Sequence, residues 1–79
     1  MSEAEILEIV RRHLAEVVPD LDPDAVRMDQ DLVNLGCSSI DRAEVATMAM
    51  SALGIVVPIM EFRHVGNIGT LVGVLRRHI

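Results

Sequence analysis

Phe62 is the only aromatic residue of this chain, although hydrophobic residues make up 51% of it. Any core must therefore be built from Leu, Ile, Val, Met and Ala side chains. Because the strands of β-sandwiches favour aromatic residues, this composition predicts helices that pack through aliphatic side chains. The length suffices for one domain, residues 1–79. A core of that size is only marginally stable unless its elements pack efficiently.

The charge of the chain argues against one class of ligand and favours another. The formal net charge is -5, and the chain contains no lysine. Nucleic acid is therefore not expected as a ligand, because phosphate binding needs clustered basic residues. An acidic surface instead suits basic protein partners, which it attracts over long range.

The cysteine and histidine content bears on location and on metal binding. Cys37 is the only cysteine, and the first residues do not resemble an export signal. This combination predicts a reducing, cytoplasmic setting. No apolar run approaches the length that spans a membrane, so we expect no membrane partner. The histidines lack metal-ligand spacing, so we expect no metal site, and we place His13 and His78 at the surface.

Hydrophobic periodicity predicts a first helix over residues 2–18, with Ser2 and Glu5 forming a capping box at its start. Pro19 ends this helix, and a long connection rich in Pro and Asp follows over residues 19–37. Loops of this length in a compact domain are unusual and often functional. Four apolar residues are spaced along the connection as anchors across a core: Val26, Met28, Leu32 and Leu35.

The second half of the chain predicts three further helices. The second helix is expected over residues 39–53, and a short helix over residues 60–65 has Met60 and Phe62 facing inward. Asn67 is a suitable N-cap for a last helix of about three turns. The expected fold is an all-α four-helix bundle, with three longer helices, one short helix and a long first loop.

Residues 35–40 read Leu-Gly-Cys-Ser-Ser-Ile and lead directly into the second expected helix. A helix N-terminus offers free N–H groups and a positive dipole potential, which stabilise a phosphate. A serine on the first turn can therefore hold a phosphodiester while the attached group swings outward. The other interpretation is helix capping, with Ser38 as N-cap and Asp41 three residues later. Capping needs only one of the two serines, which leaves Ser39 able to point to solvent.

This run resembles the attachment site of the acyl carrier protein family, which reads Leu-Gly-x-Asp-Ser-Leu at the start of the second helix. The match places the modified serine on Ser39 and the family's aspartate on Ser38. The resemblance extends over essentially the whole chain, through its length, acidity and helix order. It implies an acyl carrier that is not an enzyme, with 4′-phosphopantetheine attached to Ser39 by a phosphopantetheinyl transferase. Ser38 lacks the family's negative charge, which bears on the choice of transferase.

A longer run, Ser-Ile-Asp-Arg-Ala-Glu over residues 39–44, is similar to that of discrete carriers in bacterial polyketide β-branching cassettes. That resemblance implies a malonyl group loaded by an acyltransferase and converted to acetyl by a decarboxylating ketosynthase. The acetyl group is then donated to an enzyme resembling hydroxymethylglutaryl-CoA (HMG-CoA) synthase. The alternatives are another polyketide or fatty-acid carrier, or an unmodified helical interaction module. In each case we expect a monomer.

Partner recognition is expected beside the attachment site. Asp41 and Glu44 are interpreted as docking residues rather than as a merely solvated face, and Arg42 interrupts the acidic run in a way that could discriminate between partners. Ser38 and Met60 complete the expected recognition set. Five apolar side chains are expected to contact the arm or a short acyl chain: Leu32, Leu35, Ile40, Met60 and Val65.

We assign no catalytic residue. Cys37 adjoins the attachment site, but no histidine lies near it in the sequence and nothing obvious lowers its pKa. The run over residues 36–40 also lacks the second glycine of a serine nucleophile elbow.

Overall fold

The computed structural model describes all residues of the chain, 1–79, and its regular structure is helical. In chain order the elements are α1 (Glu3–Val17), the 3-10 helix η1 (Pro23–Ala25), α2 (Ser39–Leu53), the 3-10 helix η2 (Ile59–Phe62) and α3 (Ile68–Arg76). This confirms the all-α bundle with a long first loop. The short fourth helix is a 3-10 turn that begins and ends earlier than the predicted 60–65.

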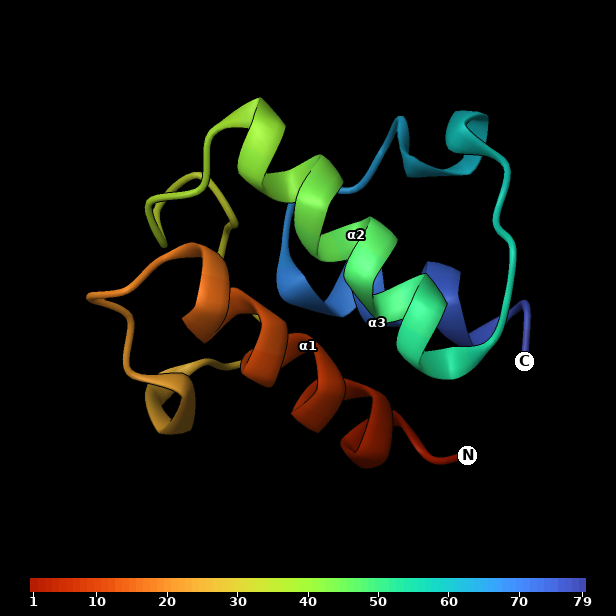
Figure 1. Cartoon of the computed structure of the whole chain (residues 1–79), viewed down its shortest axis with the longest axis horizontal. Coiled ribbons are helices and arrows are strands. Elements are labelled where there is room, and N and C mark those ends of the chain that lie inside the picture. Colours follow the sequence, from red (N-terminus) through yellow and green to blue (C-terminus); the bar gives the residue numbers. More distant parts are fainter.

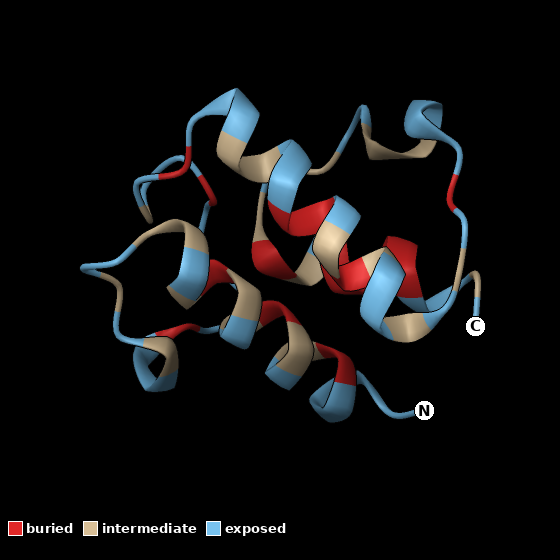
Figure 2. Ribbon diagram, in the orientation of Figure 1, coloured by how far each residue is buried: buried red, intermediate tan, exposed pale blue.

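The three longer helices form one compact arrangement. Helices α1 and α2 lie side by side and run in opposite directions, and α3 passes behind them (Figure 1). Both α2 and α3 pack against α1, and the buried residues of all three helices face the space they enclose (Figure 2). The two chain termini lie at the same end of the molecule.

The core is aliphatic, as the composition predicts, and contains no buried polar residue. On α1 the fully buried residues are Ile6, Val10 and Leu14, which recur at helical spacing along one face. Each such side chain contributes roughly 1.5–3 kcal/mol when it leaves water. Helix α3 contributes the largest set of buried residues: Ile68, Leu71, Val72, Val74 and Leu75.

The long first loop is fastened to the rest of the bundle. Val26 and Leu32 are buried, as expected of anchors, and the Arg11 guanidinium donates a hydrogen bond of 3.0 Å to the Val26 carbonyl. The Leu32 N–H donates to the Gly66 carbonyl at 3.0 Å. The loop therefore holds a fixed path between α1 and the start of α3, and it delivers the chain to the start of α2.

The loop also contains one element that the sequence analysis did not predict. In η1 the Asp22 carboxylate accepts a hydrogen bond of 3.0 Å from the Asp24 N–H, and Pro23 occupies the first position of the turn. Proline is favoured there because its N–H would lack a partner in any case. The Pro/Asp segment was interpreted as a breaker of regular structure, but it makes a single 3-10 turn.

His13 and His78 lie at the surface only in part, because both side chains are partly exposed. His13 lies three residues after Val10 and so reaches the edge of the buried face of α1. His78 Nε2 lies 2.6 Å from the Glu61 carboxylate. This contact ties the end of the chain to η2.

Candidate attachment site and adjoining pocket

The turn before α2 depends on Gly36, whose φ is +92°. Residues with a Cβ rarely adopt that conformation, so glycine is required for the turn. The Cys37 N–H then donates to the Leu32 carbonyl at 3.1 Å, and the Cys37 side chain enters the core with 4% exposure. Cys37 thus serves as a small core residue beneath the start of the helix.

Ser38 is the N-cap of α2, as predicted. Its Oγ accepts a hydrogen bond of 3.2 Å from the Asp41 N–H, and the Asp41 carboxylate accepts one of 3.0 Å from the Ser38 N–H. These reciprocal bonds form a complete capping box. The Asp41 carboxylate is therefore engaged in the capping box that its spacing from Ser38 predicts.

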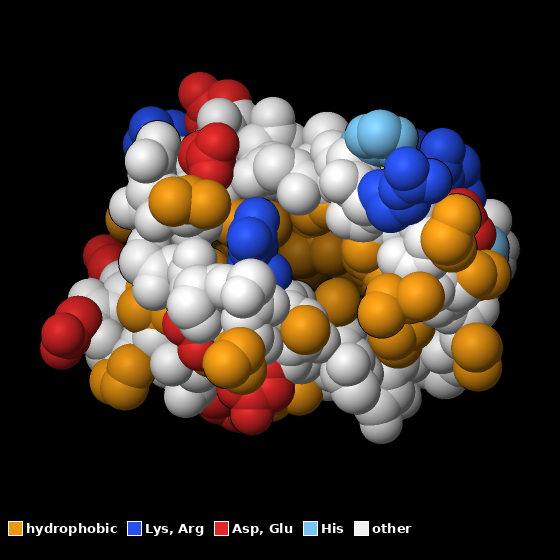
Figure 3. All heavy atoms as spheres, turned by 90° about the horizontal axis from the view of Figure 1, so that it is seen from above, with side chains coloured by type: hydrophobic (Ala, Val, Ile, Leu, Met, Phe, Trp, Pro, Cys, Tyr) orange, Lys and Arg blue, Asp and Glu red, His pale blue; other side chains and the backbone are white.

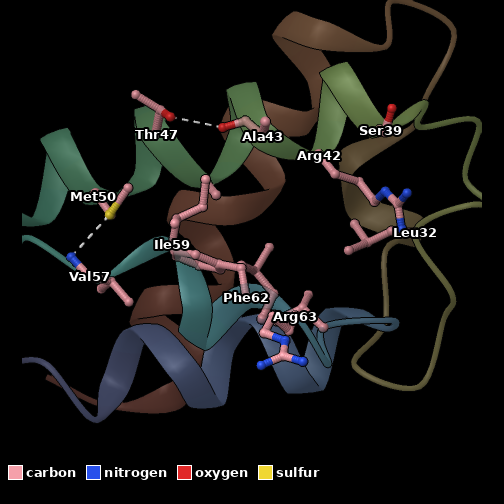
Figure 4. Close-up of a pocket in the computed structure, with 13 residues that line it drawn as sticks. Leu32, Ser39, Arg42, Ala43, Thr47, Met50, Val57, Ile59, Phe62 and Arg63 are labelled. Carbon is pink, nitrogen blue, oxygen red and sulfur yellow. Dashed lines mark hydrogen bonds between the residues drawn. The ribbon is translucent and has the colours of Figure 1, made fainter.

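Ser39 is the first residue of α2, and its side chain is exposed. Its hydroxyl takes part in none of the hydrogen bonds of the structure, because Ser38 provides the cap. Figure 4 shows the Ser39 hydroxyl projecting away from the first turn of the helix. The positive end of a 15-residue helix lies directly beneath it. This position fits a phosphodiester with an outward-pointing substituent.

The thiol of Cys37 is not a nucleophile in this setting. Burial raises its pKa, the nearby Asp41 carboxylate raises it further, and the Arg42 guanidinium opposes these effects only in part. A thiol with a raised pKa holds less thiolate at neutral pH, and the thiolate is the reactive form.

A pocket of about 400 Å³ opens between α2 and the segment that contains η2. Figure 3 shows it as a hollow with a hydrophobic floor, and Figure 4 shows side chains from both segments around it. Nine of its thirteen lining residues are hydrophobic. The lining residues are Leu32, Ser39, Arg42, Ala43, Ala46, Thr47, Met50, Val57, Ile59, Phe62, Arg63, Val65 and Leu71.

The model of a protein family described as "Phosphopantetheine attachment site" matches residues 5–75 of this chain. The chain belongs to this family of acyl carrier proteins. It is a carrier rather than an enzyme, and its prosthetic group is 4′-phosphopantetheine. The resemblance seen in the Leu-Gly-Cys-Ser-Ser-Ile run is thereby confirmed.

Two known proteins are similar to this carrier along almost its whole length. The polyketide biosynthesis acyl-carrier-protein AcpK of Bacillus subtilis (strain 168) is 39% identical over 75 residues, which cover 95% of this chain and 92% of AcpK. A chain in the crystal structure of the curacin biosynthetic pathway HMG synthase in complex with acetyl donor-ACP superposes with a TM-score of 0.84 and 31% identity. The match covers 94% of this carrier and 95% of that chain.

None of the helices of the carrier combines the length and the apolar composition needed to cross a bilayer.

Two of the five predicted arm contacts line the pocket, and three do not. Leu32 and Val65 lie in its lining, whereas Ile40 is 75% exposed and outside it. Leu35 instead lines a shallow hollow beside η1. Met60 is 64% exposed and does not face inward.

The Met60 prediction was wrong because η2 is a 3-10 turn. With three residues per turn, Ile59 and Phe62 share one face, and both line the pocket. Met60 is therefore directed elsewhere.

Most of the pocket lining was not predicted from the sequence, although six of its thirteen residues follow a readable pattern. Positions 39, 42, 43, 46, 47 and 50 recur at the spacing of one helix face, and all of them line the pocket. No comparable signal identifies Ile59 or Arg63, because their direction depends on the path of η2.

The expected recognition residues occupy different settings in the structure. Arg42 is half-buried at the pocket, Glu44 is exposed and forms no ion pair, and Met60 is exposed on η2. Ser38 and Asp41 are joined in the capping box. The structure therefore brings Arg42 together with Ser39, and leaves Glu44 and Met60 facing outward.

Proposed function

We propose that Ser39 is the residue that bears 4′-phosphopantetheine in this carrier. The supporting observation is the division of labour between adjacent serines. Ser38 satisfies the helix N-terminus, which leaves the Ser39 hydroxyl exposed and without an internal partner. Because the free N–H groups and the dipole of α2 favour negative charge at this point, a phosphodiester on Ser39 is well accommodated.

Attachment requires a phosphopantetheinyl transferase and coenzyme A. The Ser39 Oγ forms a bond to the phosphorus nearest pantetheine, the pyrophosphate bond breaks, and adenosine 3′,5′-bisphosphate leaves. The hydroxyl proton passes to a base of the transferase, because the carrier places no carboxylate or imidazole in hydrogen-bond contact with Ser39. When bound, the prosthetic group supplies a thiol that holds an acyl group as a thioester. The carrier's own residues present and distinguish that thioester.

We further propose that the carrier works in polyketide β-branching as the donor of acetyl. An acyltransferase loads malonyl, and a decarboxylating ketosynthase releases CO₂ while the α-carbon takes up a proton. The resulting acetyl group passes to an HMG-CoA synthase-like enzyme. Similarity to AcpK and to a chain from a complex of HMG synthase with acetyl donor-ACP supports this role.

The proposed docking surface surrounds Ser39. Arg42 lies one turn along the same helix, Glu44 offers a free carboxylate, and Met60 presents an exposed apolar side chain on η2. We propose that residues 1–79 act as one monomeric carrier unit in the cytoplasm.

The experiment that tests the donor role follows an isotope-labelled acetyl group. The chain is loaded with labelled acetyl-pantetheine from acetyl-CoA by a promiscuous transferase, and is then incubated with an HMG-CoA synthase-like enzyme. Label should move to the enzyme, and transfer should weaken in a Glu44→Gln variant. An Asp24→Asn variant in η1, which removes an exposed carboxylate that forms no ion pair, serves as the matched control. If the chain accepts the arm but no label reaches the enzyme, it serves another polyketide or fatty-acid pathway.

A further inference from the structure

The pocket beside Ser39 is lined by positive charge, whereas the chain as a whole is negatively charged. Arg42 and Arg63 are its only charged lining residues, and no carboxylate lines it. The whole chain, by comparison, has a net charge of -5. A cavity with an apolar floor and only positive charges favours an anionic ligand with an apolar portion.

Neither arginine has a partner within the protein. Arg11, Arg27 and Arg76 each form an ion pair with a carboxylate. Arg42 and Arg63 form no ion pair and donate no side-chain hydrogen bond. Both guanidinium groups are therefore free to bind a carboxylate from outside the protein.

We propose that this pocket binds a short acyl group that ends in a free carboxylate, with Arg42 and Arg63 as the recognition residues. The inference rests on the proposed attachment of the arm to Ser39. It implies that the carrier, when loaded with malonyl, holds the malonyl group in this pocket.

The two arginines approach the pocket from different segments. Figure 4 shows Arg42 extending from α2 toward Leu32, and Arg63 beside Phe62 with its guanidinium turned away from α2. Because Arg63 is exposed, its long side chain can rotate toward the rim of the pocket. In Figure 3 basic side chains border the hydrophobic hollow on two sides. A carboxylate at the rim keeps contact with water, so it avoids the large cost of burying a charge in the apolar floor.

Arginine suits this task chemically. Its planar guanidinium donates two parallel hydrogen bonds to a carboxylate, and it stays charged at any physiological pH. The methylene and thioester carbons of a malonyl group can then rest on the apolar lining formed by Ala46, Met50 and Val65.

Recognition of the carboxylate makes the pocket sensitive to decarboxylation. Loss of CO₂ removes the group that the arginines bind, so the acetyl product loses its electrostatic hold on the pocket. Because Arg63 is exposed and Arg42 is half-buried, the attraction is moderate, and about a threefold preference for the carboxylate form is expected. A preference of this size retains malonyl and releases acetyl to a visiting enzyme.

The test measures how well the pocket shields each thioester. The chain is loaded by a promiscuous transferase with malonyl-, acetyl- or butyryl-pantetheine, and the mass of each product is verified. Cleavage by hydroxylamine is then timed and divided by the rate for the same thioester on coenzyme A. Butyryl matches malonyl in length but carries no charge. Variants Arg42→Gln and Arg63→Gln are compared with Arg12→Gln, which replaces an exposed, unpaired arginine on α1.

In the wild type, malonyl should be shielded about threefold more than acetyl. The Arg42→Gln/Arg63→Gln double variant should lose this difference, while its butyryl rate and the Arg12→Gln rates stay unchanged. Equal shielding of malonyl and acetyl in the wild type would overturn the inference. An equal loss of shielding for malonyl and butyryl in the double variant would also overturn it. Failure of the arm to attach would instead refute the proposed function, and the mass measurement reports that result separately.

Discussion

The two sides of α2 differ sharply in how they are packed. Toward the core the helix presents Val45 and Ala49, which belong to one buried cluster with Leu14 and Leu75. Toward η2 it borders an open pocket, and Ile59 on the opposite rim is 85% exposed. One side of the helix therefore supplies stability, and the other leaves room for a cargo and for partner proteins.

The segment around η2 is held by few contacts. Phe62 and Val65 are partly buried against the core, and the Glu61 carboxylate contacts His78 at 2.6 Å. None of the residues of η2 is fully buried. Segments with so little buried apolar surface open at low free-energy cost. We therefore expect η2 to open more readily than the packing of α1, α2 and α3.

The largest expected contrast is in the free energy of unfolding. Leu14→Ala should lower it by about 3 kcal/mol, because it leaves a cavity in the core. Ile59→Ala should change it by less than about 0.5 kcal/mol, because an exposed side chain is removed. Urea unfolding followed by circular dichroism measures both values. Similar losses in the two variants would show that η2 belongs to the same packed unit as the core.

A second contrast concerns the two thiols of the arm-bearing protein. Burial raises the pKa of the Cys37 thiol, so at pH 8 it holds less thiolate than an ordinary exposed thiol. We expect the thiol of an arm on Ser39 to reach solvent and to keep its ordinary reactivity. Reaction with Ellman's reagent should be much slower for Cys37 than for the arm, because the Cys37 side chain is both buried and less ionised.

The apo form gives the control for the thiol measurement. It should show no fast-reacting thiol until urea exposes Cys37. A fast-reacting thiol in the folded apo protein would contradict the burial of Cys37 beneath the start of α2.

The smallest expected effect lies in the contact between η2 and the end of the chain. Glu61→Gln weakens the link to His78, and because both side chains are partly exposed the global stability should fall by no more than about 0.5 kcal/mol. The local effect should be clearer. The amides of Glu61 and Arg63 donate to the Pro58 and Met60 carbonyls within this segment, and their hydrogen exchange should become several-fold faster.

The control for this exchange experiment is Glu44→Gln, which removes an exposed carboxylate that has no ion-pair partner. Its exchange rates around η2 should equal those of the wild type. If Glu61→Gln also leaves them unchanged, the contact with His78 does not hold η2 in place.

The sequence predicts the two sides of α2 unequally well. Helix periodicity and caps locate α2 at residues 39–53 and identify Ser2, Ser38 and Asn67 as caps, all of which the structure confirms. These features depend on local hydrogen bonds and on a repeat of 3.6 residues.

The side that faces η2 could not be predicted in the same way. Met60 was expected to face inward, but a 3-10 turn has a different repeat, and nothing local distinguishes it from a short α-helix. Arg63 lines the pocket because of the path that the whole segment takes beside α2. Its role depends on tertiary contacts, which a single sequence does not specify.

The central claim is that two adjacent serines divide capping and attachment between them. Intact mass and urea unfolding of Ser38→Ala and Ser39→Ala, each treated with coenzyme A and a phosphopantetheinyl transferase, test it in one comparison. Ser38→Ala should gain the mass of the arm and lose about 1 kcal/mol of stability. Ser39→Ala should keep its stability and gain no mass. The account would be contradicted if Ser39→Ala gained the arm. It would also be contradicted if Ser38→Ala gained no arm and Ser39→Ala showed the loss of stability.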